Sequence, residues 1–339
     1  MEKILRIGLI GAGRIGTLHG NNLARSVSGA KLEAVAELRM STECIEWAQG
    51  LGVNKISSDP QAIIHDKNVD AVFICSSTDT HIDLIIDAAR EGKHIFCEKP
   101  IHCDIDAIRR AVSEVEKAGV TFQVGFVRRF DRNHKKVRDI VASGQLGKPH
   151  IIKITSRDPE PPPIEYVKVS GGIFMDQMIH DFDMARFLSG GEVTEIAVYG
   201  SVRIDERIGQ LGDVDTAIAM LKLDNGAIGV IENSRAARYG YDQRTEVHCD
   251  KGCVQAGNEL NDTAIISTVA GNICERPTWF FLERYNDAFI KEAQAFVQAV
   301  NEHAPPLVGA WDGLMPVCIA KAAQLSLREG RSVKLSEIM

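Results

Sequence analysis

The segment LRIGLIGAGRIG, residues 5–16, decides the fold of the first part of the chain. A short apolar run leads into the pattern G-x-G-x-x-G, and a helical pattern begins at Thr17. Strand, glycine pattern and helix stand in the order that dinucleotide binding requires. Gly11 permits the tight turn, Gly13 lets a pyrophosphate approach the backbone, and Gly16 lets the helix pack on the strand. The pyrophosphate would then bind to the amide groups at the helix N-terminus.

An acidic residue stands at the end of the next apolar run, residues 32–36. Glu37 lies 21 residues after Gly16. A carboxylate there would accept hydrogen bonds from the ribose hydroxyls and repel a 2′-phosphate, so we expect NAD as the cofactor. Arg39 is a counter-argument, because an arginine can bind the 2′-phosphate of NADP. Without the glycine pattern, Glu37 would simply be a solvated strand end.

Apolar runs and helical patterns alternate up to residue 124. Further strands are expected at residues 71–75, 94–97 and 121–124, and helices at residues 41–50, 60–66, 81–91 and 104–118. This alternation predicts an α/β Rossmann domain with a doubly wound parallel sheet over residues 1–124. Ligands bind beyond the carboxyl ends of such strands. We therefore expect cofactor contacts from Gly11, Ala12, Gly13, Arg14, Ile15, Gly16, Glu37, Ser76, Ser77, Thr80, His81, Glu98 and Lys99.

The pattern changes at residue 125. Strand-like stretches cluster at residues 150–155, 195–202, 216–223, 227–233 and 245–249. Asp224-Asn225-Gly226 between two of them is typical of a hairpin turn. We expect residues 125–339 to form an α+β domain on a large, mostly antiparallel open sheet. Two helices, residues 283–301 and 312–328, close the chain, and we expect the second to pack back on the first domain.

A helical pattern at residues 171–188 carries the candidate chemistry of the second domain. Apolar residues recur at steps of three and four over residues 174–185. Asp176 and His180 are four residues apart and would be neighbours on a helix, with Asp183 close to the same face. A carboxylate beside an imidazole can orient the ring for general acid–base catalysis. On this stretch alone, an exposed acidic face with a capped histidine is the favoured interpretation.

Composition narrows the class of protein. The chain has 339 residues, enough for two domains, and a net charge of −7, which disfavours non-specific nucleic-acid binding. No apolar run reaches membrane-spanning length and no signal peptide is recognised, so we expect a cytoplasmic protein without membrane association. Eight cysteines without paired C-x-x-C spacing are expected to be buried thiols in a reducing compartment.

Three motifs together resemble those of the Gfo/Idh/MocA oxidoreductase family: Gly11-x-Gly13-x-x-Gly16, Cys97-Glu98-Lys99-Pro100 and Asp176-x-x-x-His180. Their order matches the family, and the resemblance covers essentially the whole chain. It implies that Lys99, Asp176 and His180 take the catalytic places, and that the open sheet is the surface of a dimer or tetramer. Four further segments resemble those of family members that act on inositol: residues 128–131, 156–159, 239–242 and 283–285. This resemblance implies oxidation of an inositol, above all of myo-inositol to 2-keto-myo-inositol.

The implied chemistry is consistent with these side chains. His180 would accept the hydroxyl proton, Asp176 would orient the ring, and Lys99 would stabilise the developing alkoxide. An uncharged polyol needs several polar partners, and the candidates are Lys99, Arg129, Asp158, Asp176, His180 and Tyr241. For Tyr241, an amphipathic ring at a strand edge is an equally good interpretation.

Other functions remain open from the sequence. The substrate could be another inositol isomer or an aldose. Asp176, His180 and Asp183 could instead hold a divalent cation in a metal-dependent hydrolase or lyase. Such a function would leave the glycine pattern and the Glu-Lys-Pro motif unexplained. A non-catalytic sugar sensor on the same fold is a third alternative. We expect an NAD-dependent enzyme without a metal.

Overall fold

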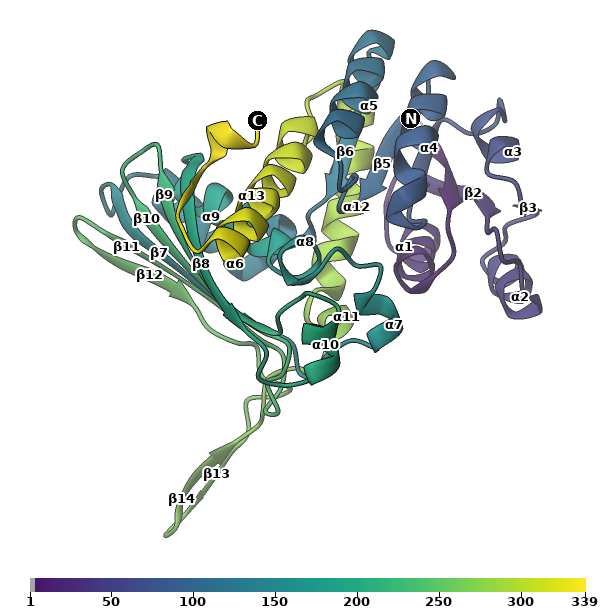
Figure 1. Cartoon of the computed structure of the whole chain (residues 1–339). Helices are drawn as coiled ribbons and strands as arrows, with labels where there is room; N and C mark the ends of the chain where they lie inside the picture. Colours follow the sequence, from purple (N-terminus) through teal and green to yellow (C-terminus); the bar gives the residue numbers. More distant parts are fainter. Residues whose placement is uncertain (1–3) are drawn as a thin grey trace. The chain divides into compact units, whose positions relative to one another are not determined.

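The computed structural model of the chain describes residues 4–339 (Figure 1). These residues form two compact units. Unit 1 contains the chain up to Val127 together with Asp287–Met315, and unit 2 contains Arg128–Asn286 together with Pro316–Met339. Each unit has its own sheet, and the two are described separately below.

Unit 1 is built on a parallel sheet of six strands in the order β3-β2-β1-β4-β5-β6. This order is that of a doubly wound dinucleotide-binding fold, which confirms the predicted fold class. The short strand β3 was not expected, because its three residues are only half-buried and carry no apolar run. The strands are β1 (Leu5–Ile10), β2 (Ala30–Ala36), β3 (Lys55–Ser57), β4 (Ala71–Ile74), β5 (His94–Glu98) and β6 (Phe122–Gly125).

Capping residues mark the ends of several helices in unit 1. In α5 the Asp104 carboxylate accepts hydrogen bonds from the first-turn amides, and Gly119 ends the helix in the left-handed region at φ 66°. In α2 the Ser41 hydroxyl accepts from the Cys44 amide. The helices between the strands are α1 (Arg14–Arg25), α2 (Thr42–Gly50), α3 (Gln61–Ile64), α4 (His81–Arg90) and α5 (Ile105–Ala118).

A helix from late in the chain completes the core of unit 1. Phe296 and Val297 of α12 (Asn286–Glu302) pack in one buried cluster with Leu9, Phe73 and Phe96 of the sheet. From the sequence, this helix was placed in the second domain. The start of α13 (Ala310–Glu329) also belongs to unit 1, where a side chain at Gly313 would collide with Ile101 and Val124.

Unit 2 is built on a sheet of seven strands in the order β12-β11-β7-β10-β9-β8-β15. Only β7 and β10 pair in parallel, so the predicted mostly antiparallel sheet is confirmed. The predicted turn before β10 is present, with Gly226 at φ 88°. The strands are β7 (Pro149–Arg157), β8 (Val193–Ser201), β9 (Thr216–Leu223), β10 (Ile228–Ser234), β11 (Asp242–Cys249), β12 (Gly252–Ala256) and β15 (Val333–Lys334).

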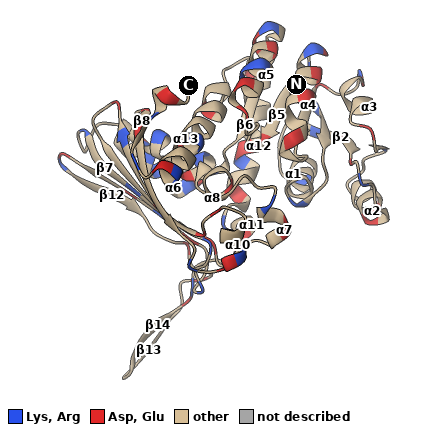
Figure 2. Ribbon diagram, in the orientation of Figure 1, with Lys and Arg blue, Asp and Glu red and all other residues tan. Residues whose placement is uncertain are grey.

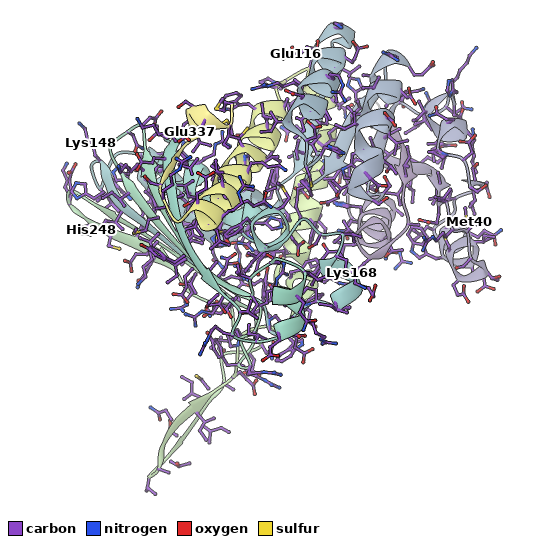
Figure 3. All side chains as sticks on the ribbon, in the orientation of Figure 1. Met40, Glu116, Lys148, Lys168, His248 and Glu337 are labelled. Carbon is purple, nitrogen blue, oxygen red and sulfur yellow. The ribbon has the colours of Figure 1, made fainter. Side chains whose placement is uncertain are left out.

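One face of this sheet is buried and the other is open. Alternate residues of β9 are buried, and α9 (Ile179–Ser189) packs against β7. Helix α6 (Arg132–Ala142) packs against β11 and β12. Side chains project from both faces of the sheet, with Lys148 and His248 labelled at one end of it (Figure 3).

A two-stranded hairpin of β13 (Ile265–Thr268) and β14 (Gly271–Cys274) extends from unit 2 and is exposed along its length (Figure 1). The sequence did not predict it. Cys253 and Cys274 are exposed, whereas Cys97, Cys249 and Cys318 are buried, so the expectation of buried thiols was wrong for part of the set.

Acidic and basic residues are interspersed along the helices and strands (Figure 2). Within residues 4–339, no helix combines the length and the apolar character that crossing a membrane would need.

Candidate active site

The glycine segment of unit 1 is shaped for close backbone approach. Gly11 has φ +91°, and a Cβ there would lie 2.5 Å from the backbone nitrogen of Ser76. A Cβ on Gly16 would lie 1.9 Å from the carbonyl oxygen of Gly11. By contrast, nothing lies within 4 Å of a Cβ built on Gly13. The segment is therefore packed tightly on its inner side and open at Gly13.

The N-terminus of α1 is suited to an anion. Its N-cap residue is Gly13, no side chain caps it, and its first turn contains no acidic residue. The first amides of a helix have no acceptor within the helix, and the helix dipole favours negative charge near them. These residues therefore fit the pyrophosphate of a dinucleotide.

Glu37, at the end of β2, lies against the glycine segment. One carboxylate oxygen accepts a hydrogen bond from the Ala12 amide at 2.7 Å, and the other accepts from the Arg39 amide at 3.0 Å. Negative charge therefore stands beside the turn that would receive the adenosine ribose, where it disfavours a 2′-phosphate.

The loop after β4 is held by its own side chains. The Ser76 and Thr80 hydroxyls are 2.7 Å apart. The His81 ring lies between the carbonyl oxygens of Ser76 and Pro100, at 3.1 and 3.0 Å, and burial lowers its pKa. We expected a cofactor contact from His81, but its ring is 1% exposed with both nitrogens engaged inside the protein. The ring instead ties the end of β4 to the segment after β5.

Glu98 and Lys99 follow the buried part of β5 and face different surroundings. The Glu98 carboxylate lies 2.8 Å from Nε2 of His19 and accepts a hydrogen bond from the Lys99 amide at 3.2 Å. Its side chain is 13% exposed, so the expected cofactor contact of this carboxylate does not fit its inward direction. The Lys99–Pro100 bond is cis.

The segment at residues 171–188 forms two helices rather than one. Two residues, Gln177 and Met178, separate helix α8 (Ile173–Asp176) from the start of α9 at Ile179. Between them, the buried side chain of Gln177 donates to the carbonyl oxygens of Ser156 and Ser234. This places Asp176 at the end of α8 and His180 in the first turn of α9. The apolar stripe is confirmed, since its four predicted members are all buried: Phe174, Met178, Phe182 and Ala185.

Asp176 lies in a cluster of charged and polar side chains. Its carboxylate accepts hydrogen bonds from the Tyr166 hydroxyl at 2.8 Å and from the Arg235 guanidinium at 3.2 Å. The Arg235 side chain is 1% exposed. Burial, together with the negative charge of Asp176, raises the pKa of Asp158 to about 7. Asp158 can therefore be a hydrogen-bond donor near neutral pH, while Asp176 accepts.

Arg235 was not predicted as a site residue, and the reason lies in the topology of the sheet. It directly follows β10, and Asp158 directly follows β7. Because β7 and β10 are parallel, with Ser234 opposite Arg157, the residues after both strands meet at one edge of the sheet. The sequence predicted a mostly antiparallel sheet without indicating which strands pair in parallel, and this edge was not recognised. A parallel pair of strand ends was the signal that could have identified Arg235.

Two residues expected to contact substrate point into the protein instead. The Arg129 guanidinium donates a bidentate pair of hydrogen bonds to the Asp183 carboxylate, from Nε at 2.8 Å and from Nη2 at 2.6 Å. The Tyr241 ring is 6% exposed, and its hydroxyl accepts from Arg128 at 3.5 Å. Arg128 also binds the buried Asp181 of α9 at 2.5 Å. These side chains therefore fix α9 on the sheet.

The alternative of a divalent cation at Asp176, His180 and Asp183 is wrong on this geometry. Asp183 is bound by Arg129, and a cation would have to displace that guanidinium. Across residues 4–339, the clustered side chains with metal-ligand spacing are His19, Glu98 and Glu292 of unit 1.

A doubly wound sheet with an open glycine turn and an acidic residue at the end of β2 defines a dinucleotide-dependent oxidoreductase. The chain belongs to the Gfo/Idh/MocA family. Residues 5–126 match the oxidoreductase family with an NAD-binding Rossmann fold, and residues 134–255 match the GFO/IDH/MocA C-terminal domain. The predicted family is confirmed.

Three known proteins show how far the likeness extends. The chain is 48% identical over 335 residues to myo-inositol 2-dehydrogenase from Thermotoga maritima, covering 99% of this chain and 100% of that protein. It is 43% identical to inositol 2-dehydrogenase from Rhizobium meliloti, covering 98% and 99%. The crystal structure of scyllo-inositol dehydrogenase from Lactobacillus casei, with bound NAD(H) and scyllo-inositol, matches with a TM-score of 0.91 at 31% identity, covering 98% and 100%.

Proposed function

We propose that this protein oxidises a secondary hydroxyl of myo-inositol with NAD, giving 2-keto-myo-inositol. The observation that carries this proposal is the cluster of Asp158, Asp176 and Arg235 at one edge of the seven-stranded sheet. Hydrogen-bond donors and acceptors gathered in one place suit a ligand that has many hydroxyls and no charge. Full-length relatives named for inositol oxidation support the same substrate.

The proposed roles divide between the two parts of the chain. Residues 1–124 bind NAD, and residues 125–339 bind the polyol. Bound NAD supplies the hydride acceptor. His180 accepts the hydroxyl proton, Asp176 orients the imidazole and stabilises its charged form, and Lys99 stabilises the developing alkoxide. Asp176 is held for this role by the Tyr166 and Arg235 hydrogen bonds.

The experiment that tests this function is a substrate panel. Purified protein is assayed with myo-, scyllo- and chiro-inositol and with aldoses, each with NAD and with NADP, at the absorbance of the reduced nicotinamide. We expect the highest kcat/KM for myo-inositol with NAD. A higher value for scyllo-inositol would correct the isomer, while turnover restricted to aldoses would refute an inositol dehydrogenase.

We also propose that the chain forms a homo-oligomer through the open face of the seven-stranded sheet. Tyr199 and Ile218 lie opposite each other on neighbouring strands and are 76% and 46% exposed. Ile228 and Ile151 form a second such pair, at 52% and 44% exposure. An apolar sheet face of this kind is typical of a protein–protein interface. Light scattering on wild type and Ile218→Lys should show dissociation of the variant, and a monomeric wild type would refute the proposal.

A further inference from the structure

Three ionisable side chains meet in the interior of unit 1. His19 comes from α1, Glu98 from the end of β5 and Glu292 from α12, and their ligand atoms lie within 4.8 Å of one another. His19 and Glu292 are 0% exposed. The walls around the His19 ring are aromatic, since its centroid lies 5.1 to 5.6 Å from those of Phe73, Phe96 and Phe289, in edge-on contact.

If Glu98 and Glu292 are both ionised, the buried Glu292 carboxylate has no hydrogen-bond donor. His19 and Glu98 are joined at 2.8 Å, while both carboxylate oxygens of Glu292 lack a hydrogen-bond donor. Over the described residues, neither carboxylate forms an ion pair with a lysine or arginine. Two buried carboxylates this close cannot both carry charge without a large cost in free energy.

A proton on Glu292 removes this conflict. The protonated carboxyl becomes a donor, and the carboxylate of Glu98, whose ligand atom lies within 4.8 Å, is the acceptor in the same cluster. Burial, and then the charge of Glu98, raise the pKa of Glu292 well above its ordinary value. The other titratable groups near the cluster are His81 and the Cys75 and Cys97 thiols. Burial lowers the pKa of His81, and burial and Glu98 raise the pKa values of the two thiols, so all three stay neutral.

We propose that Glu292 is a positioning residue: it shares a proton with Glu98, and the pair, with His19, fixes the backbone of Lys99. The connection is direct, because the Lys99 amide donates to the Glu98 carboxylate at 3.2 Å. The space for that carboxylate depends on Gly125 of β6, where a Cβ would lie only 3.0 Å from it. Glu292 is fixed in turn, since Gln123 donates to its backbone carbonyl at 3.0 Å. This inference rests on the proposed catalytic role of Lys99.

A proton accounts for the cluster better than a bound cation. Among the described side chains, a cation in this cluster would have one imidazole and two carboxylates as ligands, and the surrounding rings are aromatic. Hard cations prefer six or more oxygen ligands, and the His19–Glu98 contact has the length of a hydrogen bond. Metal analysis is nevertheless included in the test, because a cation would satisfy the same charges.

The direct test is isotope-edited infrared spectroscopy on protein labelled at glutamate, without turnover. Wild type at neutral pH should show the carbonyl stretch of a protonated carboxylic acid, and Glu292→Gln should lack it. Glu302→Gln is the matched control, because Glu302 is exposed on the same helix, and it should keep the band. Absence of the band in wild type, or stoichiometric metal that Glu292→Gln loses, would overturn the shared proton.

Kinetics test the effect on Lys99. Glu292→Gln retains a donor to Glu98 and should keep kcat close to wild type. Glu292→Leu has similar size without a donor and should lose about tenfold or more in kcat, with KM for NAD unchanged. Equal kcat in both variants would refute positioning. Because the infrared band does not depend on turnover, a wild type inactive on every polyol would refute the proposed function separately.

Discussion

Asp158 should make the stability of the protein depend on pH. Its pKa is raised from 3.8 to about 7 in the folded protein, because the half-buried carboxyl is desolvated and lies near the charge of Asp176. Between these two values the folded protein holds a proton that the unfolded chain has released. Stability is therefore lost as the pH rises through this window, and the loss is complete above the folded pKa.

The magnitude follows from the same two values. A difference of about 3 pKa units corresponds to about 4 kcal/mol at 1.36 kcal/mol per unit. Asp158→Asn keeps the shape of the side chain and cannot ionise. Its free energy of unfolding should exceed that of wild type, and the excess should grow by about 2–3 kcal/mol between pH 5 and 8.

The assay is urea unfolding without NAD, followed by tryptophan fluorescence at several pH values. Glu160→Gln is the control, because Glu160 is exposed on the same loop, and its stability should follow that of wild type. A difference between Asp158→Asn and wild type that stays constant from pH 5 to 8 would refute the reasoning. It would mean that Asp158 is ionised over the whole range and cannot donate to a hydroxyl.

Two further variants test the proposed roles in unit 1. Lys99→Ala should lower kcat by orders of magnitude, with NAD affinity and Tm nearly unchanged, because we assign the lysine to the alkoxide rather than to folding; a large loss of Tm would make Lys99 a structural residue. Glu37→Ser should reduce the preference for NAD over NADP, measured as the ratio of kcat/KM values, because it removes negative charge beside the ribose; an unchanged ratio would contradict this role for Glu37.

Much of the fold could be predicted from the sequence. The central strands of unit 1 are buried, so each is a continuous apolar run between turn signals, as in β4, residues 71–74. Strand β12 and the β13–β14 hairpin lack this signal because the residues of β12 are partly buried or exposed and those of the hairpin strands are exposed. The place of α12 was not predictable, since Phe296 shows that one helix face is buried but not which sheet covers it.

The candidate site was only partly predictable. Position in the chain indicates which residues follow a strand, and Glu37 and Lys99 were predicted as site residues on that basis. It did not give the direction of a side chain, so inward-facing Glu98 and His81 were taken for cofactor contacts. Arg235 was missed because a parallel pair inside a mostly antiparallel sheet depends on strand order rather than on local pattern.

The central claim is that His180 is the base in NAD-dependent polyol oxidation, and the pH dependence of kcat/KM tests it most directly. Wild type should rise with pH to a plateau as the ring loses its proton. His180→Ala should be far slower and should lack that limb, whereas Asp158→Asn should keep it. If wild type and His180→Ala show the same limb with similar rates, the titrating group lies elsewhere and the assignment of His180 is contradicted.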